Sequence, residues 1–168
     1  SLDNMKKTSY EDTKGITDTG SMQIAQVIYD GEWKTRHQGL SVLLRQYNQA
    51  TGIPVKFSST EMRLSDQGIF DAQVLYMTGH ESVTLKPAEI NNLRMYLQAG
   101  GILIAEACCG RKAFDDSFRS EMAKVLPGIS FQAPKKGHPI FRQPFDIGMM
   151  KVTAACARFY GGRAAISP

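Results

Sequence analysis

The feature that most constrains this fold is a short apolar run, residues 100–105, which begins with two glycines and leads into Glu106, Cys108, Cys109 and Gly110. An apolar run of this length bounded by glycine is typical of a buried strand. A helical pattern follows it. Because ligands of open α/β sheets bind where the strands end, the stretch predicts a buried strand and the position of a site, without specifying a reaction.

Strand patterns alternate with helix patterns along most of the chain. We expect strands at residues 24–29, 54–58, 72–77 and 102–105. Helices are expected between them, because apolar residues recur there every three or four positions. This alternation predicts an α/β fold of three layers, with a doubly wound, mostly parallel sheet of the flavodoxin-like type and helices on both faces.

Each expected helix has an apolar stripe and an end signal. The first is followed by Gly52, the second begins at Pro87 and stops at Gly100, and the third stops at Pro127 and Gly128. The stripes predicted to face the core are Leu40, Leu43, Leu44 and Tyr47; Ile90, Leu93 and Leu97; and Phe114, Phe118, Met122, Val125 and Leu126.

The two ends of the chain give weaker signals. Residues 1–21 are polar, and we expect them to form a flexible lead-in to a single domain over residues 22–168. After Gly128 we expect a short strand at residues 129–131. Late strands are expected within 150–156 and 163–166, and an antiparallel pair is one arrangement open to them.

Composition narrows the classes of partner. The net charge is +4, but the basic residues are scattered in pairs, so a nucleic-acid partner is not expected. No apolar run approaches the roughly 20 residues of a membrane span. Three cysteines cannot all pair within the chain, and two of them are adjacent, so a disulfide framework is not expected. The partner is left as an unknown small molecule or protein, and the compartment stays open.

Parallel strands share one carboxyl edge, so the segments after the first, third and fourth strands should converge there. The residues that can carry chemistry are Cys109, or its neighbour Cys108, as nucleophile, His80 or His138 as base, and Glu106 as an acid or base. The residues expected to contact a ligand at this edge are Asp30, Trp33, Thr78, Gly79, Cys108, Gly110 and Arg111.

Each candidate also has a structural interpretation. The cysteines can be small core residues, His80 and His138 can anchor loops, and Trp33 can pack in the core. Glu106 follows a strand predicted to be buried, so it should be paired, for example with Arg111, or have a raised pKa. Metal-ligand spacing, a P-loop and a dinucleotide fingerprint are all missing from the sequence, so we expect no metal and no cofactor.

Six segments together resemble a bacterial family known as domain of unknown function 4159. They are residues 27–33, 75–80, 93–101, 108–110, 114–119 and 138–141. The resemblance implies a fold similar to class I glutamine amidotransferases and to trehalose-utilisation-type domains. It assigns no reaction, and it implies that many members are parts of larger envelope-associated proteins.

The chain departs from the amidotransferase pattern in two places. Neither cysteine has the full set of glycines that flank an amidotransferase nucleophile, and no His-x-Glu follows Cys109. Glutaminase chemistry is therefore not expected. The hypothesis that follows is a ligand-binding or protein-interaction domain on an amidotransferase-like scaffold. The alternative is a cysteine-dependent hydrolase or transferase with Cys109 as nucleophile.

Overall fold

A computed structural model describes residues 22–35, 39–55, 60–135, 137–142, 146–148, 150–151 and 165–166, the last two pairs by backbone alone. The chain divides into two compact units, residues 1–129 and 130–168. Each unit is described by itself. The single domain over residues 22–168 stays a prediction, and the expected lead-in at 1–21 lies outside the described residues.

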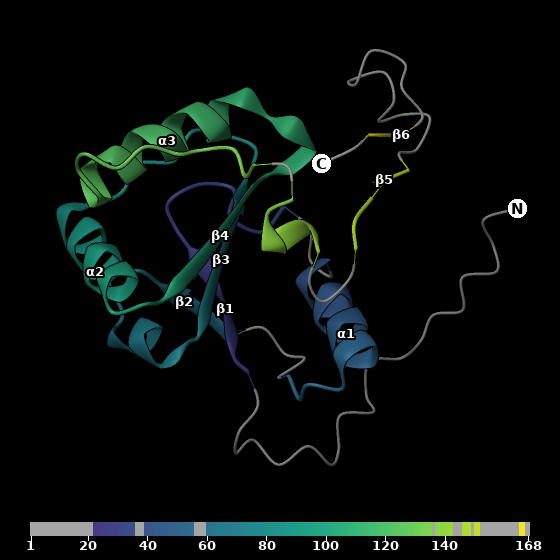
Figure 1. Cartoon of the computed structure of the whole chain (residues 1–168). Coiled ribbons are helices and arrows are strands. Elements are labelled where there is room, and N and C mark those ends of the chain that lie inside the picture. The colour runs from purple at the N-terminus through teal and green to yellow at the C-terminus, as the bar shows by residue number, and fades with distance from the viewer. Residues whose placement is uncertain are drawn as a thin grey trace, which may run out of the picture. The chain divides into compact units, whose positions relative to one another are not determined.

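The first unit is built on a parallel sheet of four strands (Figure 1). Its strands are β1 (Ile24–Ile28), β2 (Thr60–Arg63), β3 (Val74–Gly79) and β4 (Ile102–Ala107), in the order β2-β1-β3-β4. All three pairings between neighbouring strands are parallel. The predicted α/β class and parallel sheet are therefore confirmed.

Helices cover both faces of this sheet (Figure 1). The helix α1 (Gly39–Thr51) places Leu40 and Leu44 against Ile24 and Val74. The helices α2 (Pro87–Gln98) and α3 (Lys112–Val125) pack on the opposite face, where the larger core cluster lies. This arrangement of layers is consistent with a Rossmann-like layout.

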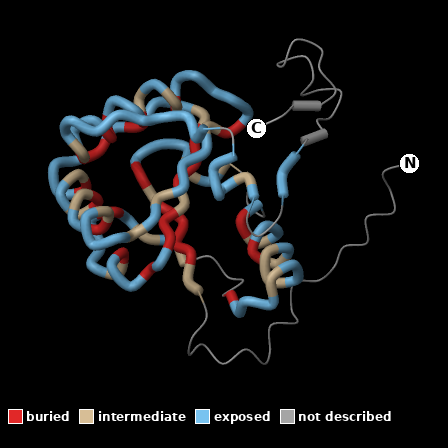
Figure 2. The backbone as a smooth tube through the Cα atoms, viewed as in Figure 1, coloured by how far each residue is buried: buried red, intermediate tan, exposed pale blue. Residues whose placement is uncertain are grey.

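The two faces follow from the alternation of side chains along the strands. Leu75 and Met77 of β3 are fully buried under α2 and α3, whereas Val74 points to the α1 side. The buried residues gather on the central strands and on the inward sides of the helices (Figure 2). The apolar stripe of α3 is confirmed at Phe114, Phe118, Met122 and Val125, which are all buried.

Three details of the sequence prediction are wrong, and a fourth is tested only in part. Of the strand expected at 54–58, the structure shows a parallel bridge between Val55 and Met22, and residues 56–59 lie outside the described set; the described strand β2 begins at Thr60. The run at 102–105 is a strand but not a buried one, because β4 is at the sheet edge, where Ile102 is 54% exposed. Leu43 of α1 points to solvent, and residues 129–131 form no strand.

The second unit contains a short 3₁₀ helix, η4 (Pro139–Phe141), and two short strands, β5 (Met150–Lys151) and β6 (Ala165–Ile166). These strands pair antiparallel, as the sequence suggested for this part of the chain. The remaining residues of the two late strands expected there lie outside the described set. Among the helices that the structure describes, none combines the length and apolar character needed to cross a membrane.

Candidate functional site

The carboxyl ends of β1, β3 and β4 lie at one edge of the sheet, because the three strands are parallel neighbours. The segments that leave them carry Glu32, His80 and the pair Cys108–Cys109. At the end of the β3–β4 ladder Gly79 lies opposite Ala107, so His80 and Cys108 follow directly from paired positions. The convergence predicted from the sequence is present for these segments.

The two cysteines lie in a tight turn, η3 (Cys108–Gly110), between β4 and α3. Cys109 has φ 57° and ψ 22°, and within the described residues it is the one non-glycine residue with positive φ. This left-handed conformation is unfavourable for a residue that carries a Cβ, and such positions cluster at functional sites. Cys108 is buried and Cys109 is exposed, yet their sulfur atoms are 3.7 Å apart.

His80 lies beside these sulfurs. One ligand atom from each of His80, Cys108 and Cys109 can be chosen so that all three lie within 4.8 Å of one another. The Nδ1 atom of His80 is 3.0 Å from Oε2 of Glu32, which leaves Nε2 for the sulfur side. The hydrogen bond with Glu32, followed by one with Cys108, raises the pKa of His80 above its ordinary value.

A buried tyrosine holds the segments of Glu32 and His80 together. Tyr29 is 2% exposed, and its hydroxyl lies within hydrogen-bond distance of two backbone oxygens, Thr78 at 2.9 Å and Glu32 at 3.1 Å. Burial and, secondarily, the charge of Glu32 raise the pKa of Tyr29 to about 12, so its hydroxyl stays protonated and donates. Buried Tyr29 therefore helps to position the backbone segments that carry Glu32 and His80.

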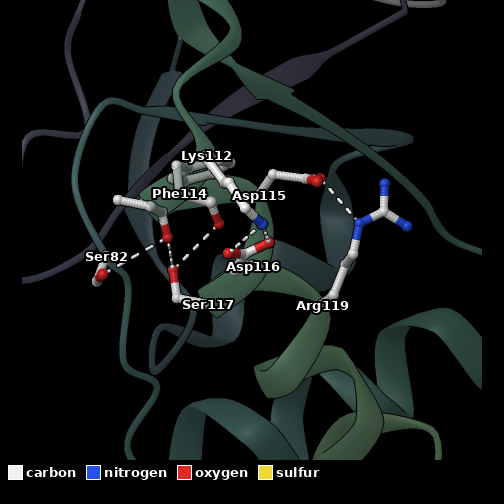
Figure 3. Close-up of polar contacts among 8 residues, drawn as sticks. Ser82, Lys112, Phe114, Asp115, Asp116, Ser117 and Arg119 are labelled. Carbon is white, nitrogen blue, oxygen red and sulfur yellow. Dashed lines mark hydrogen bonds and ion pairs between the residues drawn. The ribbon is translucent and has the colours of Figure 1, made fainter.

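The loop after His80 is fixed to the start of α3. The hydroxyl of Ser117 accepts a hydrogen bond from the backbone N–H of Val83 at 2.9 Å and donates to the carbonyl of Ala113 at 2.8 Å. Ser82 also reaches toward Ala113 (Figure 3). Since α3 begins directly after the cysteine turn, these contacts hold the histidine loop and the cysteine turn in one arrangement.

Polar side chains continue from the cysteines onto the α1 side of the sheet. The hydroxyl of Tyr76 donates to the carboxylate of Glu106 on the adjacent strand. Thr78 lies 3.3 Å from the hydroxyl of Thr35, and the amide of Gln26 donates to the backbone carbonyl of Trp33. Burial, together with Glu106, raises the pKa of Tyr76, which keeps that hydroxyl a donor. This face can offer both donors and acceptors to a ligand.

The remaining predicted residues fall into different surroundings. Asp30 is exposed and forms ion pairs with Arg63 and Lys86, and its contact with a ligand stays a prediction. Trp33 is half-buried and packs against the main core cluster, as its structural interpretation expected. His138 lies in the other unit, where its Nδ1 accepts from the backbone N–H of Ile140 at 3.2 Å, a local contact of the loop-anchor kind.

Two expectations about residues near the cysteines need correction or restriction. Glu106 does not follow a buried strand: it belongs to the exposed edge strand β4, and its described partner is Tyr76 rather than Arg111. The backbone N–H of Arg111 closes the η3 turn by donating to the carbonyl of Cys108 at 3.2 Å. Roles in ligand binding for Gly79, Gly110 and Arg111 stay predictions.

Sequence reasoning assigned no role to Glu32 or Tyr76. Glu32 was visible in the turn after the first strand, but nothing in a one-dimensional pattern links it to a histidine 48 positions later. Tyr76 had a usable signal. It alternates with Thr78 along β3, which places both hydroxyls on one face of the sheet.

Comparison with known proteins identifies the family of this chain. A model of the family described as Domain of unknown function (DUF4159) matches residues 23–165, which span the sheet, the histidine loop and the cysteine turn. The chain belongs to this family. A search of the curated proteins finds no match. The DUF4159 match confirms the resemblance seen in the sequence.

Proposed function

We propose that this DUF4159 domain is a cysteine-dependent acyl-transfer enzyme, a hydrolase or transferase, with Cys109 as nucleophile. The observation that carries the proposal is the strained, exposed Cys109 beside a histidine that a carboxylate orients. A nucleophile next to a base, with a third group holding the base, is the general arrangement of covalent catalysis. Cys108 is buried, so a substrate carbonyl reaches Cys109 more readily.

The sulfur of Cys109 attacks the carbonyl carbon of an ester, thioester or amide, and the thiol proton passes to His80. The carbon–leaving-group bond breaks, and the leaving group takes that proton. Water then attacks the thioester, and His80 accepts its proton and returns it to the departing sulfur. Glu32 orients the imidazole throughout, and the backbone amides of Gly79 and Gly110 are the proposed oxyanion donors.

The scaffold supports this proposal at the level of analogy. Class I glutamine amidotransferases, whose fold the family resemblance implies for this chain, also place a cysteine after a strand of a parallel sheet. The proposed carboxylate and histidine of this chain come instead from the segments after β1 and β3, before the cysteine in sequence. The reaction proposed here is therefore not glutamine hydrolysis.

The test uses p-nitrophenyl acetate as an acylating probe on a Cys156→Ser background, which leaves only the adjacent thiols. We expect stoichiometric p-nitrophenolate release and an acetyl adduct, detected by mass spectrometry, that Cys109→Ser abolishes and Cys108→Ser retains. His80→Gln should slow acetylation by about 100-fold, the lower range for a general base. Glu32→Gln should also slow it. The matched control is Glu61→Gln, because Glu61 of β2 is also a carboxylate with a cationic partner, here Lys34, and it should leave the rate unchanged.

Two results would contradict the proposal. One is acetylation of the folded protein no faster than that of a short cysteine peptide. The other is a loss of rate with His138→Gln and none with His80→Gln, which would place the base in the second unit.

A second candidate function is ligand binding without chemistry. The polar face that includes Tyr76, Glu106 and Thr35 favours it, because these partly buried or exposed side chains carry donors and acceptors. Thermal-shift screening with sugars, amino acids and short peptides tests it. A stabilising compound whose effect is lost in Tyr76→Phe, while Cys109→Ser keeps it, would support this candidate over the thiol enzyme.

A further inference from the structure

We infer that His80, Cys108 and Cys109 form a three-donor Zn²⁺ site whose fourth position is open to solvent. The inference does not depend on the proposed function, because these atoms can bind a metal whether or not Cys109 attacks a carbonyl. It also departs from the sequence analysis, which expected no metal because the cysteines lack the spacing of common zinc motifs.

The spacing of the sulfurs is the first argument. Two sulfurs bound tetrahedrally to one Zn²⁺, with Zn–S bonds of about 2.3 Å, lie about 3.8 Å apart. The sulfurs of Cys108 and Cys109 are 3.7 Å apart. Adjacent residues of an extended strand would point to opposite sides. Here the η3 turn and the left-handed backbone of Cys109 bring both sulfurs to one side. The strained backbone conformation therefore places the two sulfurs close enough to bind one metal ion.

The third donor, a ring nitrogen of His80, lies near the position that a tetrahedral Zn²⁺ would require. With a Zn–N bond of about 2.1 Å, a nitrogen and a sulfur on one tetrahedral Zn²⁺ are about 3.6 Å apart. All three donor atoms already lie within 4.8 Å of one another. A movement of about 1 Å, within reach of side-chain rotation, completes the geometry. Imidazole and thiolate together favour zinc among the common divalent ions.

The surroundings of His80 resemble those of a metal ligand. A histidine that binds metal usually donates its other ring N–H to a carboxylate, which fixes the tautomer and the direction of the ring. Glu32 takes this position at Nδ1, 3.0 Å away, so we infer that Nε2 is the nitrogen that would bind the metal. Cys108 is buried and Cys109 is exposed, so a fourth ligand can enter from the Cys109 side.

A bound Zn²⁺ would occupy the sulfur that the proposed enzyme uses as nucleophile. Thiolates bind the metal, so each thiol that is protonated beforehand releases its proton on binding. Metal and acyl substrate are then alternative partners of Cys109. In the enzyme proposed above, zinc would act as a reversible inhibitor.

The experiment titrates the reduced, chelator-treated chain with Co²⁺, a spectroscopic substitute for Zn²⁺, on the Cys156→Ser background. We expect one equivalent to give a thiolate charge-transfer band and the intense visible bands of tetrahedral Co²⁺, both removed by added Zn²⁺. Cys108→Ser, Cys109→Ser and His80→Gln should each abolish this spectrum. Glu32→Gln should weaken the affinity by about 10- to 100-fold, while Glu61→Gln leaves it unchanged.

Because Cys108 is buried, its variant can fail to fold, so a second measurement uses the chain with both thiols intact. One equivalent of Zn²⁺ should protect Cys108 and Cys109 from alkylation by iodoacetamide, and excess chelator should restore the reaction. Weak octahedral Co²⁺ spectra, or full alkylation in the presence of Zn²⁺, would overturn the inference. Zinc binding without acetylation would refute the proposed function alone, and acetylation without zinc binding would refute this inference alone.

Discussion

Gly79→Ala is the substitution that most directly tests the packing beneath the site. A Cβ added at Gly79 would lie well inside van der Waals distance of two buried groups, the Tyr29 hydroxyl and the Phe114 ring. Tyr29 is 2% exposed and Phe114 is 1% exposed, so neither can turn into solvent to make room. The methyl group must therefore displace one of these side chains or the strand.

The cost can be worked from these contacts. Inserting a methyl group into a packed core costs about 1–3 kcal/mol. If Tyr29 moves, its 2.9 Å hydrogen bond to the carbonyl of Thr78 is also lost, which adds about 0.5–1.5 kcal/mol. We therefore expect Gly79→Ala to lower the free energy of unfolding by about 1.5–4.5 kcal/mol.

Urea denaturation followed by circular dichroism measures this change. The matched control is Gly68→Ala, because the nearest side-chain atom to a Cβ there is the methyl carbon of Met62 at an ordinary 3.5 Å. The control should be neutral or stabilised by up to about 1 kcal/mol. The double variant Tyr29→Phe with Gly79→Ala should cost less than the sum of the singles, because the hydroxyl that clashes is gone. A Gly79→Ala protein as stable as Gly68→Ala would refute the reasoning.

Two further predictions concern charged side chains. Hydrogen bonds from Lys86 and Arg63 lower the pKa of Asp30, so its contribution to stability is present above the unfolded value of about 3.9 and is lost as the pH falls through the folded value. Asp30→Asn should therefore have a lower urea midpoint than wild type at neutral pH, with the two midpoints converging in acid; a constant difference would contradict this. Arg94 of α2 donates to the carbonyls of Lys124 and Val125 at 2.7 and 2.8 Å, so Arg94→Met should cost about 1–3 kcal/mol. Lys112→Met, which removes an exposed pair with Asp116, should cost at most about 0.5 kcal/mol in the same denaturation assay, and an equal loss in both would refute the difference.

The class of fold was predictable because the apolar pattern changes period along the chain. The stripe of Phe114, Phe118, Met122 and Val125 could form only on a helix with one buried face, and that face is buried. The strand β2 was not predicted at Thr60–Arg63, because this segment contains only one apolar residue, Met62, and so carries little hydrophobic signal. The burial of β4 was wrong because an apolar run predicts a strand but not its position in the sheet.

Sheet topology predicted which segments meet at the site, but not which side chains pair there. Parallel strands share an edge, so the closeness of His80 to Cys108 followed from the expected sheet. The partner of His80 did not, because the choice of Glu32 over Asp30 depends on which way each side chain of one short turn points. Asp30 binds Arg63 and Lys86 instead. The backbone angle of Cys109 likewise belongs to the folded turn rather than to any sequence pattern.

The Tyr29 hydroxyl links the interior of the protein to its surface chemistry. A single phenol lies within hydrogen-bond distance of the carbonyls of both Thr78 and Glu32, and its ring packs near Phe114. Substitutions that touch neither thiol nor imidazole can therefore retune reactivity by shifting where that ring lies. Variation among related sequences at Tyr29 or Phe114 would therefore change the positions of Glu32 and His80, and with them the reactivity of the site.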